Sequence, residues 1–364
     1  MVIFPIFNSY GLVIISFQIK NPQSEERGDL KKTSEYFNSL SDTHVINKMI
    51  SSTNFNFVKI NKWLDTGNVE ELAKTREYFN SCIHVLDKPK ESIYLHSDFV
   101  VKFFADKLTN TNRIKRSILL KDIVPKITHS DFNFYRYKKI EGNILSECVT
   151  EKSFLNLLQW SKDKLWILST FNGDFKKSCN EFYYNKTKQR IQDYLNNKRD
   201  EHTTINGEKI PPIHDLVEKI DFNVLCDGIF TQIHGDFILD NIIQTDNGFT
   251  LIDWRQDFSG ILDGGDIYYD LAKLNHNLTV NHNIVSQKLY NENPDNCYIL
   301  CNSTLMRCKE ILKKFIIDNN YNYKKVSILT AIIWINMAPL HEYPFNKFLF
   351  NFGKYNLFQQ LKNE

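Results

Sequence analysis

The chain has 364 residues and a mass of 43.0 kDa, too long for one small domain, so two or three lobes are expected. Its composition is that of a globular protein in water, with 42% hydrophobic residues, 24% charged residues and a mean hydropathy of −0.38. The net charge of +2 gives no electrostatic reason to expect nucleic acid or an anionic membrane surface as a partner.

The N-terminal stretch 1–19 carries no charge, yet it lacks the basic start and the small-residue cleavage site of a signal peptide. Pro5, Asn8 and Gln18 argue against a membrane span. We expect two strands instead, over 2–7 and 11–19. The seven cysteines are an odd number in a long chain, which indicates free thiols in a reducing compartment. A cytoplasmic protein without membrane insertion is expected.

Further along, residues 21–34 read as a loop, 35–50 as one or two short helices, 55–60 as a strand and 69–79 as a helix capped by 65–68. Short apolar runs then predict strands at 83–86, 92–95, 99–104, 124–127 and 132–140, with a helix at 112–120. After Gly142 helical spacing dominates, at 154–168, at 182–196 and from 254 onward, interrupted by β structure at 228–253. This order predicts an α+β protein with a β-rich lobe at 78–142 and a helical lobe at 143–364, preceded by a segment 1–77.

The most informative feature is a predicted hairpin whose turn is centred on Asn247 and Gly248. That turn would pair Gln244 with Leu251, and it would bring Asn241 and Asp253 to the open end of the hairpin. Asp236 lies five residues before Asn241, on the loop that enters the hairpin. An amide oxygen and two carboxylates therefore converge, which are the oxygen ligands that Mg²⁺ prefers.

These residues carry a family resemblance. His234-Gly235-Asp236 with Asn241 resembles the H-G-D-x-x-x-x-N catalytic loop of the aminoglycoside phosphotransferase and choline kinase group, which has the protein-kinase-like fold. Residues 251–254 (LIDW) resemble the metal-binding segment of that group, and 265–272 (GDIYYDLA) resemble its G-D-P-x-x-D-L-A motif, with Ile267 in place of proline. The resemblance covers about residues 80–364.

The resemblance implies a role for each motif residue. Asp236 would be the catalytic base for an acceptor hydroxyl, while Asn241 and Asp253 would hold Mg²⁺ on the phosphates of ATP. His234 would anchor the loop. Asp266 and Asp270 would be structural, with Asp270 opening a helix and bracing the catalytic loop.

A kinase-like lobe should also supply a strand lysine, and Lys102 stands alone in the apolar run 99–104. The run 135–142 resembles the hinge at which backbone groups meet adenine, which makes Tyr137 and Ile140 candidate nucleotide contacts.

Two features of this lobe depart from the family pattern. The turn over 87–92 contains no glycine, so phosphate contacts would have to come from side chains such as Lys88 or Ser92, or from a few backbone amides. The segment 105–125 contains no glutamate to pair with Lys102, which leaves the partner of this lysine open.

The segment 1–77 resembles, over 40–47 and 63–68, the end of a sugar-phosphate nucleotidyltransferase. The glycine-rich loop that grips the nucleoside triphosphate in that family is absent, which favours a degenerate remnant.

The sequence thus predicts an ATP- and Mg²⁺-dependent phosphotransferase acting on a hydroxyl of a small molecule, such as a sugar, choline or a related amino alcohol. A pseudokinase-like nucleotide-binding or scaffolding protein and a nucleotidyltransferase-related protein of polysaccharide metabolism are the alternatives. Trp254, Asp257 and Glu342 are candidate residues for a cationic acceptor.

Overall fold

The computed structural model describes residues 2–8, 11–17, 58–59, 68–71, 74, 83–88, 90–197 and 201–362. The chain divides into two compact units, 1–82 and 83–364. Each unit is described by itself.

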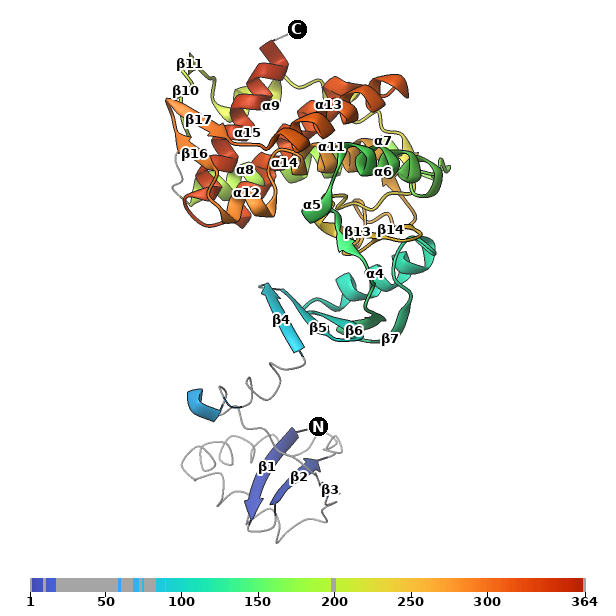
Figure 1. Ribbon diagram of the computed structural model, residues 1–364. Coiled ribbons are helices and arrows are strands. Elements are labelled where there is room, and N and C mark those ends of the chain that lie inside the picture. The colour runs from blue at the N-terminus through green and yellow to red at the C-terminus, as the bar shows by residue number, and fades with distance from the viewer. Residues whose placement is uncertain are drawn as a thin grey trace, which may run out of the picture. The chain divides into compact units, whose positions relative to one another are not determined.

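The first unit contains a small antiparallel sheet in the order β1-β2-β3 (Figure 1). Its strands are β1 (Val2–Asn8), β2 (Gly11–Phe17) and β3 (Val58–Lys59). The two strands predicted at the start of the chain are therefore confirmed, and Asn8 pairs with Gly11 across their turn. The nucleotidyltransferase-like stretches 40–47 and 63–67 lie outside the described residues, so that resemblance stays a prediction.

The second unit begins with a five-stranded antiparallel sheet in the order β4-β5-β6-β8-β7, accompanied by one helix, α4. The apolar alternation of these segments explains the sheet, and four of its strands lie close to their predicted ranges. The exception is β7, which begins at Ile127, where the strand predicted over 124–127 was expected to end. The strands are β4 (Ile83–Lys88), β5 (Glu91–His96), β6 (Phe99–Phe104), β7 (Ile127–Asp131) and β8 (Phe134–Lys138). Helix α4 (Lys107–Leu119) packs against β6, β7 and β8. It begins earlier than predicted, because the side chain of Asp106 caps it by accepting from the backbone N–H groups of Leu108 and Thr109.

The chain leaves the small lobe through Gly142 and forms a two-residue strand, β9 (Asn143–Ile144), which pairs with β13. Gly142 has a φ of +146°, and a Cβ atom at this position would lie 2.3 Å from the carbonyl oxygen of Gln244. Only glycine allows the backbone to approach the hairpin this closely. The result is a three-stranded sheet, β14-β13-β9, at the junction of the two lobes.

The predicted hairpin exists, formed by β13 (Ile242–Thr245) and β14 (Gly248–Leu251), but its register differs from the prediction. Gln244 pairs with Phe249 rather than with Leu251, and Thr245 pairs with Gly248, so Asp246 and Asn247 form the turn. The backbone N–H of Asn247 donates to the Thr245 hydroxyl at 3.3 Å, a side-chain bond that stabilises this turn position. The partners shift by two residues, so every side chain keeps its face of the sheet.

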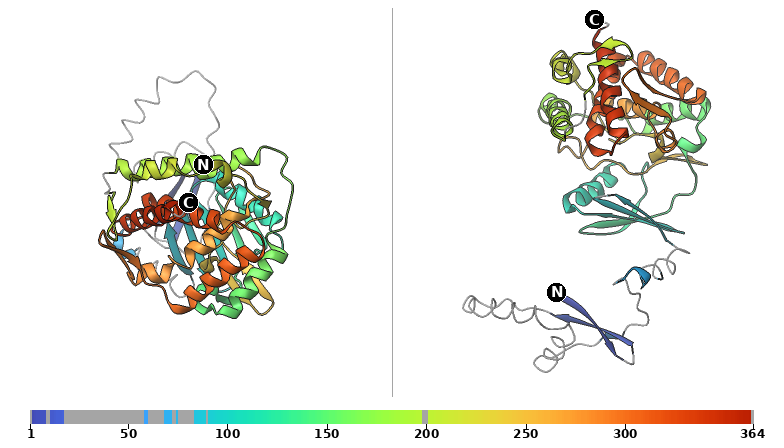
Figure 2. Two further views of the ribbon diagram at one scale, coloured as in Figure 1. Left: turned by 90° about the horizontal axis from the view of Figure 1, so that it is seen from above. Right: turned by 90° about the vertical axis from the view of Figure 1, so that its left-hand side faces the viewer.

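The large lobe is mainly helical (Figure 2), and α14 (Tyr323–Met337) is buried within it. This helix is apolar on nearly all sides and packs against α15 (Phe345–Lys362), α11 (Ile267–Asn277) and α8 (Lys186–Asn196). The predicted helix 182–196 is divided into a π-helical turn, η1 (Glu181–Asn185), followed by α8. The other helices are α5 (Leu145–Cys148), α6 (Glu151–Lys164), α7 (Phe175–Asn180), α9 (Ile213–Glu218), α10 (Phe222–Leu225), η2 (Leu239–Asn241), α12 (His282–Ser286), α13 (Ser303–Asp318) and η3 (Ala338–Leu340). The short strands of this lobe are β10 (Thr204–Ile205), β11 (Glu208–Lys209), β12 (Phe230–Thr231), β15 (Gly265–Asp266), β16 (Tyr290–Asn293) and β17 (Asn296–Ile299).

The predicted α+β, two-lobed organisation is therefore confirmed: a β-rich small lobe precedes a larger helical lobe, and the hairpin of β13 and β14 lies where they meet (Figure 1). No helix in the described part of the chain is both long enough and apolar enough to cross a bilayer.

Candidate active site

The loop that carries Asp236 is held in place by hydrogen bonds to Asp270, a fully buried residue of α11. Its carboxylate accepts hydrogen bonds from the backbone N–H groups of His234, at 2.8 Å, and Gly235, at 2.7 Å. Burial raises the pKa of Asp270 to about 6, although both of these bonds favour the ionised form. Asp270 does not open the helix as predicted, because Asp266 caps α11 and the helix begins at Ile267.

His234 joins the loop to the hairpin and is itself buried. Its Nδ1 accepts from the backbone N–H of Asp236 at 3.2 Å, and its Nε2 lies 3.0 Å from the carbonyl oxygen of Ile252. Since a carbonyl only accepts, the proton of the neutral ring is on Nε2. Burial lowers the pKa of His234 to about 4, so the ring is neutral at physiological pH.

Asp266 is buried away from the open part of the site. It accepts from the Tyr183 hydroxyl at 2.8 Å and from the backbone N–H of Ile229 at 3.0 Å, and Lys325 lies 3.6 Å from it. Burial raises the pKa of Asp266. These contacts join the start of α11 to η1, to the residue before β12 and to α14, so Asp266 braces the large lobe near the loop that carries Asp236.

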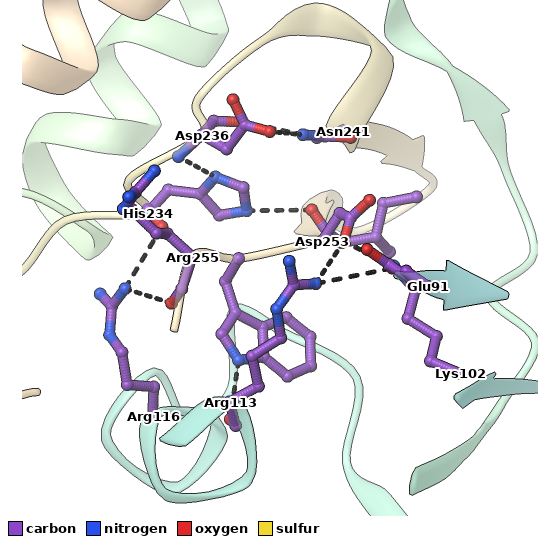
Figure 3. A network of polar contacts seen from close by, with 11 residues as sticks. Glu91, Lys102, Arg113, Arg116, His234, Asp236, Asn241, Asp253 and Arg255 are labelled. Atoms are coloured by element: carbon purple, nitrogen blue, oxygen red, sulfur yellow. Dashed lines mark hydrogen bonds and ion pairs between the residues drawn. The ribbon is translucent and has the colours of Figure 1, made fainter. Parts of the chain in front are cut away.

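A buried arginine of the small lobe also holds the loop. Arg116 of α4 donates to the backbone carbonyl oxygens of Ile233, of His234 at 3.5 Å and of Arg255 at 2.6 Å (Figure 3). Its side chain has almost no exposed surface. Helix α4 is therefore joined directly to the two segments that carry Asp236 and Asp253.

Asp236 is the most accessible of the motif carboxylates, with a side chain that is 37% exposed. Its Oδ1 lies 2.7 Å from the Nζ of Lys273, which projects from α11. The Nδ2 of Asn241 donates to the Asp236 backbone carbonyl oxygen at 3.0 Å and lies 3.3 Å from Oδ2. Burial acts to raise the pKa of Asp236, but Lys273 outweighs it and the pKa is lowered. The carboxylate is thus ionised at neutral pH and fit to accept a proton.

Asp253 belongs to a cluster of charged side chains (Figure 3). Its Oδ1 lies 2.6 Å from the Nζ of Lys102 and 2.5 Å from the guanidinium of Arg113. Glu91 completes the cluster, at 3.4 Å from Lys102 and 3.8 Å from Arg113. Asp253 has a φ of +63°, a left-handed conformation that aspartate tolerates better than most residues.

Lys102 has two acidic partners in this cluster, Asp253 and Glu91. Lys102 is almost completely buried and pairs with an acid on the neighbouring strand, Glu91 of β5, while α4 supplies the basic Arg113. The small lobe therefore places the acid on the strand and a base on the helix. Sequence reasoning missed both residues, although the strand register holds a signal: Lys102 pairs with Ile93, and Glu91 lies on the same face of β5 two residues away.

The oxygen donors fit a hard divalent cation. Asp236, Asn241 and Asp253 offer two carboxylates and one amide oxygen, and the Nδ2 of Asn241 is already engaged with Asp236, which leaves its Oδ1 as the ligand atom. Within the described residues no group of three or more His, Cys, Asp or Glu side chains is placed to hold a metal. Such a small protein ligand set suits Mg²⁺, which keeps several waters and substrate phosphates as ligands.

A cavity of about 260 Å³ opens beside Asp236 and Asp253. Its walls come from η1 and α8, from α11, and from α14 with η3, while Arg113 is the contribution of the small lobe. Five of its lining residues are basic, namely Arg113, Lys186, Arg190, Arg255 and Lys273.

The residues expected to favour a cationic acceptor do not line this cavity. Trp254 is buried against Tyr135, and its Nε1 donates to the Arg113 carbonyl oxygen at 2.8 Å. Asp257 accepts from the backbone N–H of Gly260, and Glu342 is exposed elsewhere. The expectation of an acidic or aromatic acceptor site formed by these three residues is therefore wrong.

The remaining sequence candidates lie in the small lobe. Lys88 ends β4 opposite Glu91, and only its backbone is described. Ser92 lies in β5, Tyr137 is buried in β8 and Ile140 is half-buried between β8 and β9. None of these residues lines the cavity, and their part in nucleotide binding stays a prediction.

No protein-family model matches the chain, and neither does any curated protein. Among solved structures, the chain is similar to the streptomycin–ATP–APH(2")-IIa ternary complex, with 14% identity, a TM-score of 0.45 and coverage of 81% of this chain and 97% of that one. It is also similar to a choline kinase from Cryptosporidium parvum (15% identity, TM-score 0.44, coverage 79% and 92%) and to an ethanolamine kinase from Plasmodium vivax (15%, 0.43, 88% and 94%). The names of these structures fall in the enzyme group whose motifs the sequence resembles.

Proposed function

We propose that the chain is an ATP-dependent phosphotransferase that moves the γ-phosphate to a hydroxyl of a small molecule. The observation that supports this most is the convergence of Asp236, Asn241 and Asp253 with Lys102 at the junction of the lobes. These side chains reach the site from three separate segments, and together they would supply the base, the metal ligands and the phosphate contact that phosphoryl transfer uses.

The chain's own residues would divide the work as follows. Asp236 would take the proton of the acceptor hydroxyl as its oxygen bonds to the γ-phosphorus and the bond from phosphorus to ADP breaks. Asn241 and Asp253 would hold Mg²⁺, whose charge would stabilise the phosphate oxygens. Lys102, oriented by Glu91, would contact the phosphates from the sheet.

The acceptor would enter through the cavity between the catalytic loop and the large-lobe helices, because this cavity reaches Asp236 directly. A sugar or an amino alcohol is of suitable size. The exposed fraction of Asp236 supports its role as a base that meets a ligand, since His234, Asp266 and Asp270 are buried instead.

A catalytically weak nucleotide-binding protein is the second candidate, and one observation favours it. Asp253 Oδ1 already lies within 2.6 Å of both Lys102 and Arg113, so a metal ion would compete with two cations for this carboxylate. An active enzyme must move at least one of them when Mg²⁺ and nucleotide bind.

The test is an ATP-consumption screen with Mg²⁺ over hexoses, choline, ethanolamine and aminoglycosides, followed by Asp236→Asn. We expect acceptor-dependent turnover that falls about 10²–10⁴-fold in this variant, with ATP binding unchanged. Asp246→Asn is the matched control, because Asp246 is exposed at the far end of the same hairpin. Full activity in Asp236→Asn would exclude this base, and the absence of any acceptor-dependent turnover despite ATP binding would favour the second candidate.

A further inference from the structure

Positive charge exceeds negative charge in the cavity beside Asp236. Its five basic residues face two acidic ones, Asp236 and Asp253. Two of the bases are engaged by these acids, since Lys273 pairs with Asp236 and Arg113 with Asp253. Lys186, Arg190 and Arg255 are therefore left over as a group, which we call the cation cluster.

In the described part of the chain, the cation cluster lacks an ion-pair partner. Within residues 90–197 and 201–362, no carboxylate forms an ion pair with Lys186, Arg190 or Arg255. Arg255 donates its Nε–H to the Asp257 carbonyl oxygen at 2.9 Å, a bond that leaves its charge uncompensated. In a folded protein, partly buried charge of one sign is unfavourable unless something of the opposite sign accompanies it.

An aromatic ring provides a surface for the cluster but does not neutralise it. The Nζ of Lys186 lies 4.1 Å from the centroid of the Phe182 ring, and the Arg255 guanidinium carbon lies 5.0 Å from the same centroid. Such contacts are attractive, because the face of an aromatic ring carries partial negative charge. Burial, followed by the charges of Arg255 and Arg190, lowers the pKa of Lys186, which is the effect expected of like charges held together.

The fold places the cluster on the acceptor side of the site. Phe182, Lys186 and Arg190 follow one another at intervals of four residues and so share one face of η1 and α8, both in the large lobe. None of the strands of the five-stranded sheet contributes to the cavity, and Lys102 meets Asp253 from that sheet. Lys102, the expected phosphate contact, therefore does not line the cavity that holds the cluster. A π-helical turn such as η1 is also often found at functional sites.

We propose that the acceptor carries an anionic group, a phosphate or a carboxylate, in addition to the hydroxyl that is phosphorylated. The anionic group would bind Lys186 and Arg190, and the hydroxyl would meet Asp236. Arginine suits this role because its planar guanidinium binds carboxylate and phosphate oxygens in pairs. The inference rests on the proposed function and narrows its acceptor class from sugars and amino alcohols in general to acidic hydroxy compounds.

The experiment compares acceptors that share a skeleton and differ in charge. Glucose, glucosamine, glucose 6-phosphate and glucuronate form one set, and glycerol, glycerol phosphate and glycerate form another. We expect kcat/KM for an acidic member to exceed that of its neutral counterpart by about 10-fold or more, the value of one charged hydrogen bond. Comparison of the phosphorylated with the carboxylated member then identifies the anionic group.

Substitutions in the cation cluster test whether it causes the preference for acidic acceptors. Lys186→Met and Arg190→Met should each raise the KM of the acidic acceptor by about 10-fold or more while the KM of ATP stays unchanged. Lys188→Met is the matched control, since Lys188 belongs to the same helix, is exposed and lies over Tyr184 outside the cavity. It should change neither constant.

The outcomes separate this inference from the proposed function. Turnover that is best with a neutral or cationic acceptor, and unchanged in Lys186→Met, overturns the anionic acceptor and leaves the phosphotransferase intact. If no acceptor is turned over, the binding of glucose 6-phosphate and glycerol phosphate to the intact protein is measured instead. Binding that is weakened in Lys186→Met supports an anionic ligand. The absence of binding at millimolar concentration overturns the anionic acceptor.

Discussion

Arg116 offers the sharpest test of how the site is held together. The change is Arg116→Met, which keeps a long apolar side chain in the buried space and removes the guanidinium. Arg116 has about 1% of its surface exposed and donates to three backbone carbonyl oxygens, two of them in the catalytic loop.

The magnitude follows from these contacts. A hydrogen bond from a charged donor contributes about 1.5–3 kcal/mol, and carbonyl oxygens left unpaired in the interior add a further penalty. Part of this loss is offset, because a buried guanidinium no longer has to be desolvated. We expect a net loss of about 3–5 kcal/mol in the free energy of unfolding. For a unit of this size that corresponds to a fall in Tm of about 5–10 °C.

The measurement is thermal and urea unfolding of the full chain, with Arg307→Met as the matched control. Arg307 is 64% exposed on α13 and pairs with Glu151 at 2.8 Å, so its loss should change the stability by less than about 0.5 kcal/mol. If Arg116→Met is destabilised by less than about 1 kcal/mol, or no more than the control, the anchoring of the loop by α4 is not as argued.

Two further predictions concern the carboxylates. Lys273→Met should raise the pKa of Asp236, because the ion pair that lowers it is lost, and the acid limb of kcat/KM should therefore move to higher pH. Lys273→Arg should leave the limb in place, and an unmoved limb in the methionine variant would contradict this role of the ion pair. Asp270 has a folded pKa of about 6, above its unfolded value, so its carboxylate is protonated in the folded state as the pH falls below about 6. Protonation of Asp270 removes an acceptor from the N–H groups of His234 and Gly235, so activity should fall as the pH decreases through about 6. Asp270→Asn should lower activity at every pH and abolish this acid limb of the pH profile. A pH profile identical to that of the unmodified protein would refute the assignment of the limb to Asp270.

The sequence was sufficient for features that local pattern determines. Short apolar runs separated by turn residues located the strands of the small lobe, and the spacing of Asp236, Asn241 and Asp253 located the loop end of the hairpin. The register of that hairpin escaped, because the Thr245 hydroxyl stabilises a turn one residue earlier than the Asn-Gly pair suggested.

Contacts across long stretches of chain escaped as well. Arg113 reaches Asp253 over 140 residues, and Lys273 reaches Asp236 from α11, a helix for which the sequence suggested only the structural roles of Asp266 and Asp270. The basic character of the cavity arises in the same way, because Lys186 and Arg255 belong to separate segments that only the fold brings to one ring. Contacts between residues this far apart in the chain leave no periodic pattern in the sequence.

The connection between the lobes has a mechanical consequence. Lys139 is tied to the small lobe by its backbone N–H, which donates to the Asp98 carbonyl oxygen at 2.9 Å, and Asn143 is tied to the large lobe by pairing with Gln244. Any hinge bending between the lobes is therefore concentrated in Ile140, Glu141 and Gly142. The backbone proposed to meet adenine is the same backbone that would flex, so a nucleotide bound there would restrict the bending of the hinge.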